Sequence, residues 1–220
     1  VRPMLAASAK TAEEAVGAVG GGDLLVDGKL DGIRSQVHRR ACEVTVYTRS
    51  LDEITERVPE VVEAVAALPG GDLVLDGEAI VMLDDGRPAP FQVTGSRTAS
   101  SADVAGLRER VPLTTFLFDL LHRDGVDLID ETAKVRHDSL VDLAPHLVVP
   151  RLLTDDPGAA EAGSHLVAAE FPQAVRHECR SAVHVVQQFG MLVNIAAPGR
   201  AIGLQVGDAV DDWHGDPVPV

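Results

Sequence analysis

Apolar and polar residues alternate over much of residues 23–130, and a period of two predicts β-strands with one buried face. Short polar turns separate the first three such segments, which indicates an antiparallel meander. Two longer apolar segments predict further strands, and an Asp-Asp-Gly-Arg turn signal follows the first of them. The five predicted strands are LLVDGKL at 24–30, IRSQVHRR at 33–40, EVTVYTR at 43–49, and residues 72–83 and 113–121.

Four other segments space their apolar residues as a helix does. A Thr-x-x-Glu start caps the first predicted helix, and the sequence Pro69-Gly70-Gly71 ends the second. The predicted helices span residues 11–19, 58–68, 131–147 and 157–170. Antiparallel runs of strands with inserted helices are typical of the α+β class, which we therefore expect.

The pattern changes after about residue 178. Apolar runs continue through 179–220, but the capping and turn signals there no longer agree with one another. We therefore expect one domain at 1–178 and a divergent tail at 179–220. The tail is expected to pack loosely and to make few contacts with the rest of the chain.

Composition narrows the class of protein. The chain has 220 residues and a net charge of −15, which argues against binding nucleic acid by bulk electrostatics alone. Its two cysteines cannot form a disulfide framework or a four-cysteine zinc site. No apolar run is as long as a membrane span, and the opening residues do not form a secretory signal. We expect a reduced, cytoplasmic protein without membrane contact, and composition leaves the oligomeric state open.

The segment Asp27-Gly-Lys-Leu-Asp-Gly-Ile-Arg34 carries the most chemical information. A covalent phosphoramidate site needs a lysine on a rigid element, a glycine for close backbone approach and a nearby cation for phosphate charge. Lys29, Gly32 and Arg34 supply these groups. The alternative is an ordinary hairpin in which Lys29 is a solvated strand residue and Asp31-Gly32 forms the turn. We expect Arg39 and Arg40, with Arg34 and His38, to form a solvated basic face of this hairpin.

Further motifs follow in order and give the chain a family resemblance. It resembles the adenylation (nucleotidyltransferase) domain of bacterial ATP-dependent DNA ligases over roughly residues 1–178. The resemblance implies an α+β, ATP-grasp-like fold of antiparallel sheets with flanking helices. The matching segments are RPMLA at 2–6, KLDGIR at 29–34, TRS at 48–50, LDGE at 75–78, PFQ with a later arginine at 90–97, and FLFDLLHRDGVDLID at 116–130.

The resemblance also implies a role for each matching residue. Lys29 would be the nucleophile that takes AMP from ATP, and Asp27 would contact the adenine. Arg34 and Arg49 would contact ribose, phosphate or the nicked strand, as the planar arginine fork suits phosphate.

Two further residues complete the site that the resemblance implies. Phe118 would stack on adenine, and Glu78 would hold the ribose and help to organise Mg²⁺. The implied cofactors are therefore ATP and Mg²⁺, and the implied partner is nicked double-stranded DNA.

The end of the chain departs from the family pattern. The family continues with two lysine-containing blocks that bind the triphosphate, but no lysine follows Lys134 here. Cys179 stands where the first block has a glycine. The family's following OB-fold domain is also missing from the sequence, so we interpret the chain as truncated or frame-disrupted after about residue 178. Its adenylation activity is expected to be very weak or absent.

Three alternatives remain at this stage. A catalytically inactive remnant would act at most as a nucleotide-binding or interaction module. An RNA ligase or capping-type nucleotidyltransferase shares the K-x-D-G motif, but the RPMLA opening and the block at 116–130 fit DNA ligases better. An NAD-dependent ligase is disfavoured because such enzymes usually carry a four-cysteine zinc site.

Overall fold

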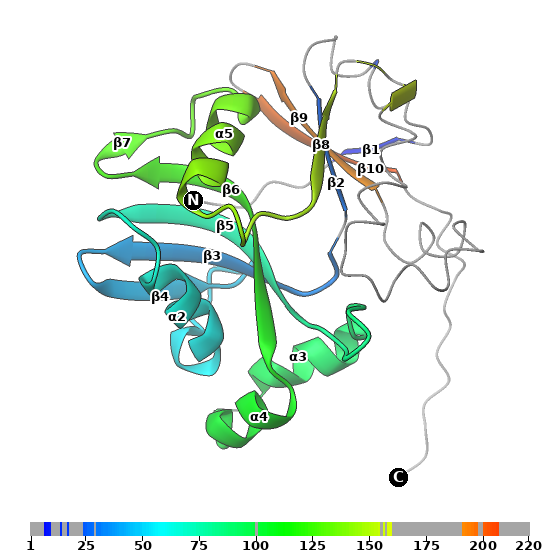
Figure 1. Ribbon diagram of the computed structural model, residues 1–220. Helices are drawn as coiled ribbons and strands as arrows, with labels where there is room; N and C mark the ends of the chain where they lie inside the picture. The colour runs from blue at the N-terminus through cyan, green and yellow to red at the C-terminus, as the bar shows by residue number, and fades with distance from the viewer. Residues whose placement is uncertain are drawn as a thin grey trace.

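The computed structural model describes residues 7–9, 14, 17, 24–28, 30–99, 101–154, 156, 158–159, 191–197 and 200–206. Lys29 and most of the helices predicted at 11–19 and 157–170 lie outside the described residues. The described strands are β1 Ala7–Ala9, β2 Leu24–Gly28, β3 Ile33–Arg40, β4 Glu43–Tyr47, β5 Leu73–Val81, β6 Leu113–Arg123, β7 Val126–Asp127, β8 Arg151–Thr154, β9 Met191–Ala197 and β10 Arg200–Val206 (Figure 1). The helices are a 3₁₀ turn η1 Thr55–Arg57, α2 Pro59–Ala66, α3 Phe91–Ala99, α4 Val104–Arg110 and α5 Ala133–Leu143.

The strands form two five-stranded sheets. The first, called the meander sheet from here on, has the order β4-β3-β5-β6-β7, with every neighbouring pair antiparallel. Its order departs from a strict meander in one place, because β5 pairs with β3 and not with β4. The second sheet has the order β1-β10-β9-β2-β8, and β1 alone pairs in parallel. Antiparallel sheets with flanking helices confirm the predicted α+β class.

β2 does not join the meander, although the alternation of its residues predicted that it would. It pairs with β8 and β9 in the second sheet instead. The chain changes sheets at the Asp31-Gly32 step, where Gly32 packs directly against β5. A Cβ atom on Gly32 would lie 2.2 Å from Ile80 Cγ2 and 2.6 Å from the Ala79 carbonyl oxygen, so only glycine fits there.

The expectation that residues 179–220 make few contacts with the domain is wrong for the strands at 191–197 and 200–206. β9 and β10 pair with each other, and β9 also pairs with β2 along Leu25–Gly28. β9 has strands on both sides. β2 and β9 are far apart in sequence, so no local period could have identified this pairing.

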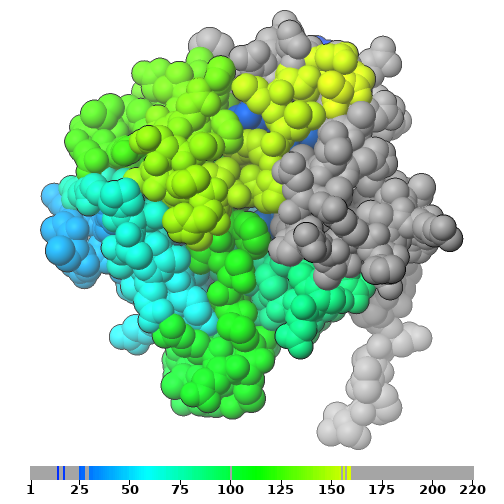
Figure 2. Space-filling view, in the orientation of Figure 1, coloured from blue at the N-terminus to red at the C-terminus, as the bar shows by residue number. Residues whose placement is uncertain are grey.

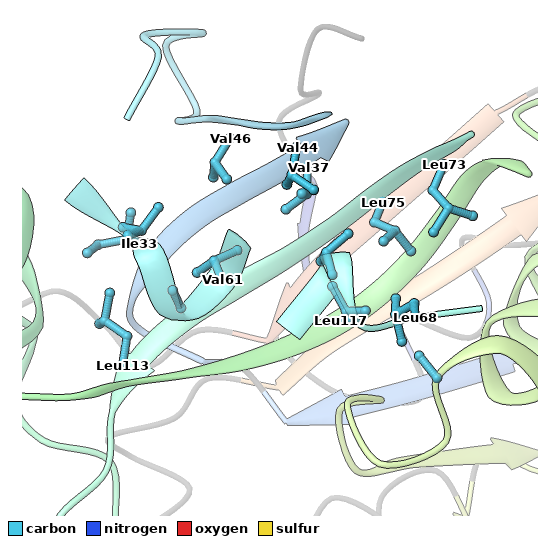
Figure 3. Close-up of a cluster of buried hydrophobic side chains, with 14 of the residues drawn as sticks. Ile33, Val37, Val44, Val46, Val61, Leu68, Leu73, Leu75, Leu113 and Leu117 are labelled. Carbon is cyan, nitrogen blue, oxygen red and sulfur yellow. The ribbon is translucent and has the colours of Figure 1, made fainter. Parts of the chain in front are cut away.

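The hydrophobic core lies between the meander sheet and α2, and it includes residues of α5. Figure 3 shows Val61 of α2 among side chains of the sheet, including Val37, Leu75 and Leu117. These four side chains are fully buried. The helix begins with proline and a glutamate in its first turn, both favourable where backbone N–H groups lack helical partners.

Arg39 corrects the expected exposed basic face of β3. Its side chain is buried and donates to four carbonyl oxygens at the end of α2 and just beyond it. The donor–acceptor distances are 3.0 Å to Val65, 2.7 Å to Leu68, 2.8 Å to Pro69 and 2.7 Å to Gly71. A cation at the C-terminus of a helix also suits the helix dipole. Arg40 remains exposed.

Candidate active site

The antiparallel register brings three of the predicted site residues together on the meander sheet. Arg34 on β3 pairs directly with Glu78 on β5, and Glu78 pairs with Phe116 on β6. Phe118 lies two residues further along β6, beside a register shift in the β5–β6 ladder. Lys29 belongs to the part of the chain outside the described residues, one position after the end of β2.

Glu78 fixes the backbone of the K-x-D-G segment. The N–H of Gly32 donates to Glu78 Oε1 at 3.0 Å, across 46 residues of sequence. Gly32 is also in close contact with β5, as described above. The carboxylate predicted to hold the ribose therefore anchors the turn that follows Lys29 in sequence.

Arg34 lies between a carboxylate and an aromatic ring. Its Nε donates to Asp76 Oδ1 at 2.5 Å, and its Nη2 donates to Asp76 Oδ2. Its guanidinium carbon is 5.2 Å from the centre of the Phe118 ring, within range of a cation–π interaction. Burial works to lower the pKa of Arg34, but hydrogen bonding and attraction from Asp76 outweigh it and raise the pKa.

Two aspartates next to this arginine are cross-strand partners. Asp76 on β5 pairs with Asp119 on β6, and Arg136 of α5 donates to Asp119 from Nε at 2.7 Å and Nη2 at 3.0 Å. Burial raises the pKa of Asp76, the charge of Asp119 adds to this effect, and the hydrogen bond from Arg34 opposes it. The result is an alternating row of charges across four elements, Arg34–Asp76–Asp119–Arg136.

Asp27 faces Arg151 of β8. Arg151 Nε and Nη2 donate to the two carboxylate oxygens of Asp27, and both side chains are almost fully buried. Arg151 Nη2 also donates to the Phe118 carbonyl oxygen at 3.0 Å, and Nη1 lies 3.2 Å from Nδ1 of His137 on α5. Burial and, to a lesser extent, the positive charge of Arg151 lower the pKa of His137.

Arg49 stands apart from this group. It is exposed in the turn after β4 and, within the described part of the chain, makes no hydrogen bond or ion pair. The turn is held by its neighbours, since Thr48 Oγ1 lies 3.0 Å from Ser50 Oγ and the N–H of Ile54 donates to the Val46 carbonyl at 2.9 Å.

Sequence reasoning missed Asp76, Asp119, Arg136 and Arg151. Asp76 and Asp119 lie inside quoted motifs, so their positions were visible but their pairing was not. Arg136 and Arg151 had no local signal, because their partners lie 17 and 124 residues away in sequence.

No cluster of three or more histidine, cysteine, aspartate or glutamate side chains suited to a metal occurs among the described residues. Magnesium is commonly held by one or two carboxylates together with substrate phosphates, so a single carboxylate such as that of Glu78 is chemically suited to it. No helix among the described residues is long and apolar enough to cross a membrane.

The arrangement of the two sheets is similar to that of solved nucleic-acid ligases, and this similarity concerns the fold. The ligase domain of Mycobacterium tuberculosis LigD superposes with a TM-score of 0.61 at 21% identity, covering 93% of this chain and 60% of that chain. The ATP complex of the ATP-dependent DNA ligase from bacteriophage T7 gives a TM-score of 0.52 at 15% identity, covering 93% and 68%. An archaeal ATP-dependent RNA ligase gives 0.53 at 15% identity, covering 92% and 47%.

The sequence then defines the family. The family model for the ATP dependent DNA ligase domain matches residues 3–152, and the chain belongs to that family. A probable DNA ligase of Beutenbergia cavernae is 56% identical over 164 residues, 73% of this chain and 31% of the relative. DNA ligase B of M. tuberculosis is 46% identical over 158 residues, 71% of this chain and 31% of the relative. The resemblance seen in the sequence is confirmed, and the chain spans about a third of the length of these relatives.

Proposed function

We propose that this chain carries the nucleotide-binding part of a bacterial ATP-dependent DNA ligase and forms lysyl-AMP on Lys29. The family match supports this proposal together with one structural observation. Arg34, Glu78 and Phe118 lie on three adjacent strands, and Glu78 accepts a hydrogen bond from Gly32 in the K-x-D-G segment.

In the proposed reaction, deprotonated Nζ of Lys29 attacks the α-phosphorus of ATP. A P–N bond forms, the bond to the bridging oxygen breaks, and pyrophosphate leaves. The 5′-phosphate at a nick in duplex DNA then displaces the lysine and becomes adenylated. The 3′-hydroxyl attacks that phosphate, the strands are joined and AMP leaves. Nick sealing of this kind serves replication, repair and recombination of DNA in the cytoplasm.

The described side chains supply binding and orientation in this scheme. Phe118 offers a ring to adenine, and Arg34, already fixed by Asp76, offers a cation to the nucleotide. Arg49, exposed in its turn, would contact ribose, phosphate or the nicked strand. Glu78 would hold the ribose and, with the nucleotide phosphates, Mg²⁺, which would stabilise negative charge on the transferring phosphoryl group.

The number of lysines makes the proposal easy to test, because the chain has only Lys10, Lys29 and Lys134. Incubation with α-labelled ATP and Mg²⁺ should label the protein slowly, since no lysine follows Lys134 to bind the triphosphate. Lys29→Ala should abolish the label. Lys134→Ala is the matched control, because Lys134 pairs with Asp138 on the exposed side of α5, and it should label like the wild type. Label on Lys29→Ala would contradict the proposal.

A further inference from the structure

Arg151 joins the two sheets at one point. It is the cross-strand partner of Asp27 in the second sheet, and it donates to the Phe118 carbonyl of the meander sheet. Its third contact, with His137, reaches α5. Residues of α5 and of the segment leading into β8, yellow-green to yellow in Figure 2, form one continuous part of the surface. A single guanidinium therefore fixes β2, β6 and α5 relative to one another.

The two strands that Arg151 connects carry separate parts of the proposed site. Asp27 lies two residues before Lys29, and Phe118 is the residue whose backbone accepts from Arg151. By holding β2 to β6, Arg151 thus sets the distance between the strand that leads to the proposed nucleophile and the strand that carries the ring proposed to stack on adenine.

Stability alone does not explain why this position is an arginine. Apolar residues of similar volume often replace a buried ion pair without loss of stability. The planar guanidinium can instead hold a carboxylate with two hydrogen bonds and still direct donors to other acceptors, which lysine cannot do.

We propose that Arg151 is a positioning residue for lysyl-AMP formation, acting through Asp27 on the strand before Lys29 and through the Phe118 carbonyl on the adenine side. This inference rests on the proposed function. It also gives Asp27 a role other than adenine contact, because Arg151 binds both oxygens of its carboxylate.

Arg151 makes two contacts, one with the Asp27 carboxylate on β2 and one with the Phe118 carbonyl on β6, and their loss predicts different kinetic effects. Asp27→Asn weakens only the contact of Arg151 with β2. The initial rate of labelling at saturating ATP should therefore fall about 10-fold or more, and the ATP concentration at half-maximal rate should change little. Arg151→Lys weakens both contacts, so the rate of labelling should fall and the half-saturating ATP concentration should rise.

A double variant separates positioning from stability. Asp27→Asn/Arg151→Met leaves no charge buried without a partner, so its melting temperature should approach that of the wild type. Its labelling rate should nevertheless stay low. Arg123→Met is the matched control, because Arg123 also connects β6 to α5, through Ser139 and Asp142, and it should label at the wild-type rate.

The possible outcomes are distinct. A folded double variant with a low rate supports the positioning role. Wild-type rates and half-saturation in Asp27→Asn, Arg151→Lys and the double variant would overturn it while leaving the proposed function intact. Absence of label on the wild type would overturn the proposed function and this inference with it.

Discussion

Glu60 neutralises the most deeply buried cation in the described part of the chain. Arg97 of α3 is fully buried, and its Nη2 donates to Glu60 Oε1 at 2.7 Å and Oε2 at 2.9 Å. Among the described residues, Arg97 Nε and Nη1 have no hydrogen-bond partner, so Glu60 is its only anionic contact. Glu60 Oε1 also accepts from the N–H of Leu113 at 3.2 Å and therefore connects α2, α3 and β6.

Glu60→Gln should be strongly destabilising, because it removes the charge that compensates a buried arginine. Breaking a buried ion pair from one side costs about 3–5 kcal/mol. For a chain of this size each kcal/mol lowers the melting temperature by about 2–4 °C, so the expected decrease is about 6–20 °C. Urea unfolding monitored by circular dichroism measures the free energy of unfolding, and a thermal scan measures the melting temperature.

The same helix provides the control. Glu63 pairs with Arg108 at the surface, where both side chains are exposed, and Glu63→Gln should leave the unfolding midpoint nearly unchanged. Glu60→Gln/Arg97→Met should recover much of the stability lost in the single variant. Equal midpoints for Glu60→Gln and Glu63→Gln would refute the conclusion that burial determines the value of these pairs.

Two further predictions concern the frame of the site. Gly32→Ala should lower stability by about 1–3 kcal/mol through overpacking against Ile80, measured by urea unfolding. Gly17→Ala should not, because a Cβ added there would meet no atom of the described residues within 4 Å. The folded-state pKa of His137 lies below its ordinary value of 6.5, so the unfolded chain binds more protons there and stability should fall as pH drops below about 6.5. His137→Gln should show a smaller loss between pH 7 and pH 5, and an unchanged pH slope would contradict the lowered pKa.

Periodicity predicted the strands β3, β4 and β5 and the helix α2, because each has one face that is more buried than the other along part of its length. β3, β4 and β5 alternate between buried and more exposed positions along parts of their length, which the sequence displays directly. β2 has the same local pattern, but its membership of the second sheet depends on pairing with β8 and β9. Those partners lie more than a hundred residues away, and no local period identifies them.

The candidate site likewise contains residues that the sequence indicated and residues that only the structure shows. The family resemblance indicated Arg34, Glu78 and Phe118, and the register of β3, β5 and β6 places them on adjacent strands. It could not indicate Arg151, whose role depends on a carboxylate 124 residues away and on a backbone oxygen of another sheet. Buried arginines such as Arg39 and Arg97 were also beyond local reasoning, because an arginine in sequence is first expected at the surface.

The most direct test of the central claim is to map the adenylated residue by peptide mass spectrometry. The full chain is incubated with ATP and Mg²⁺, denatured, digested and searched for AMP on each of its three lysines. The proposed chemistry predicts an AMP adduct on the peptide containing Lys29 and on neither Lys10 nor Lys134. An adduct on Lys10 or Lys134 instead of Lys29, or no adduct on any peptide after prolonged incubation, would contradict it.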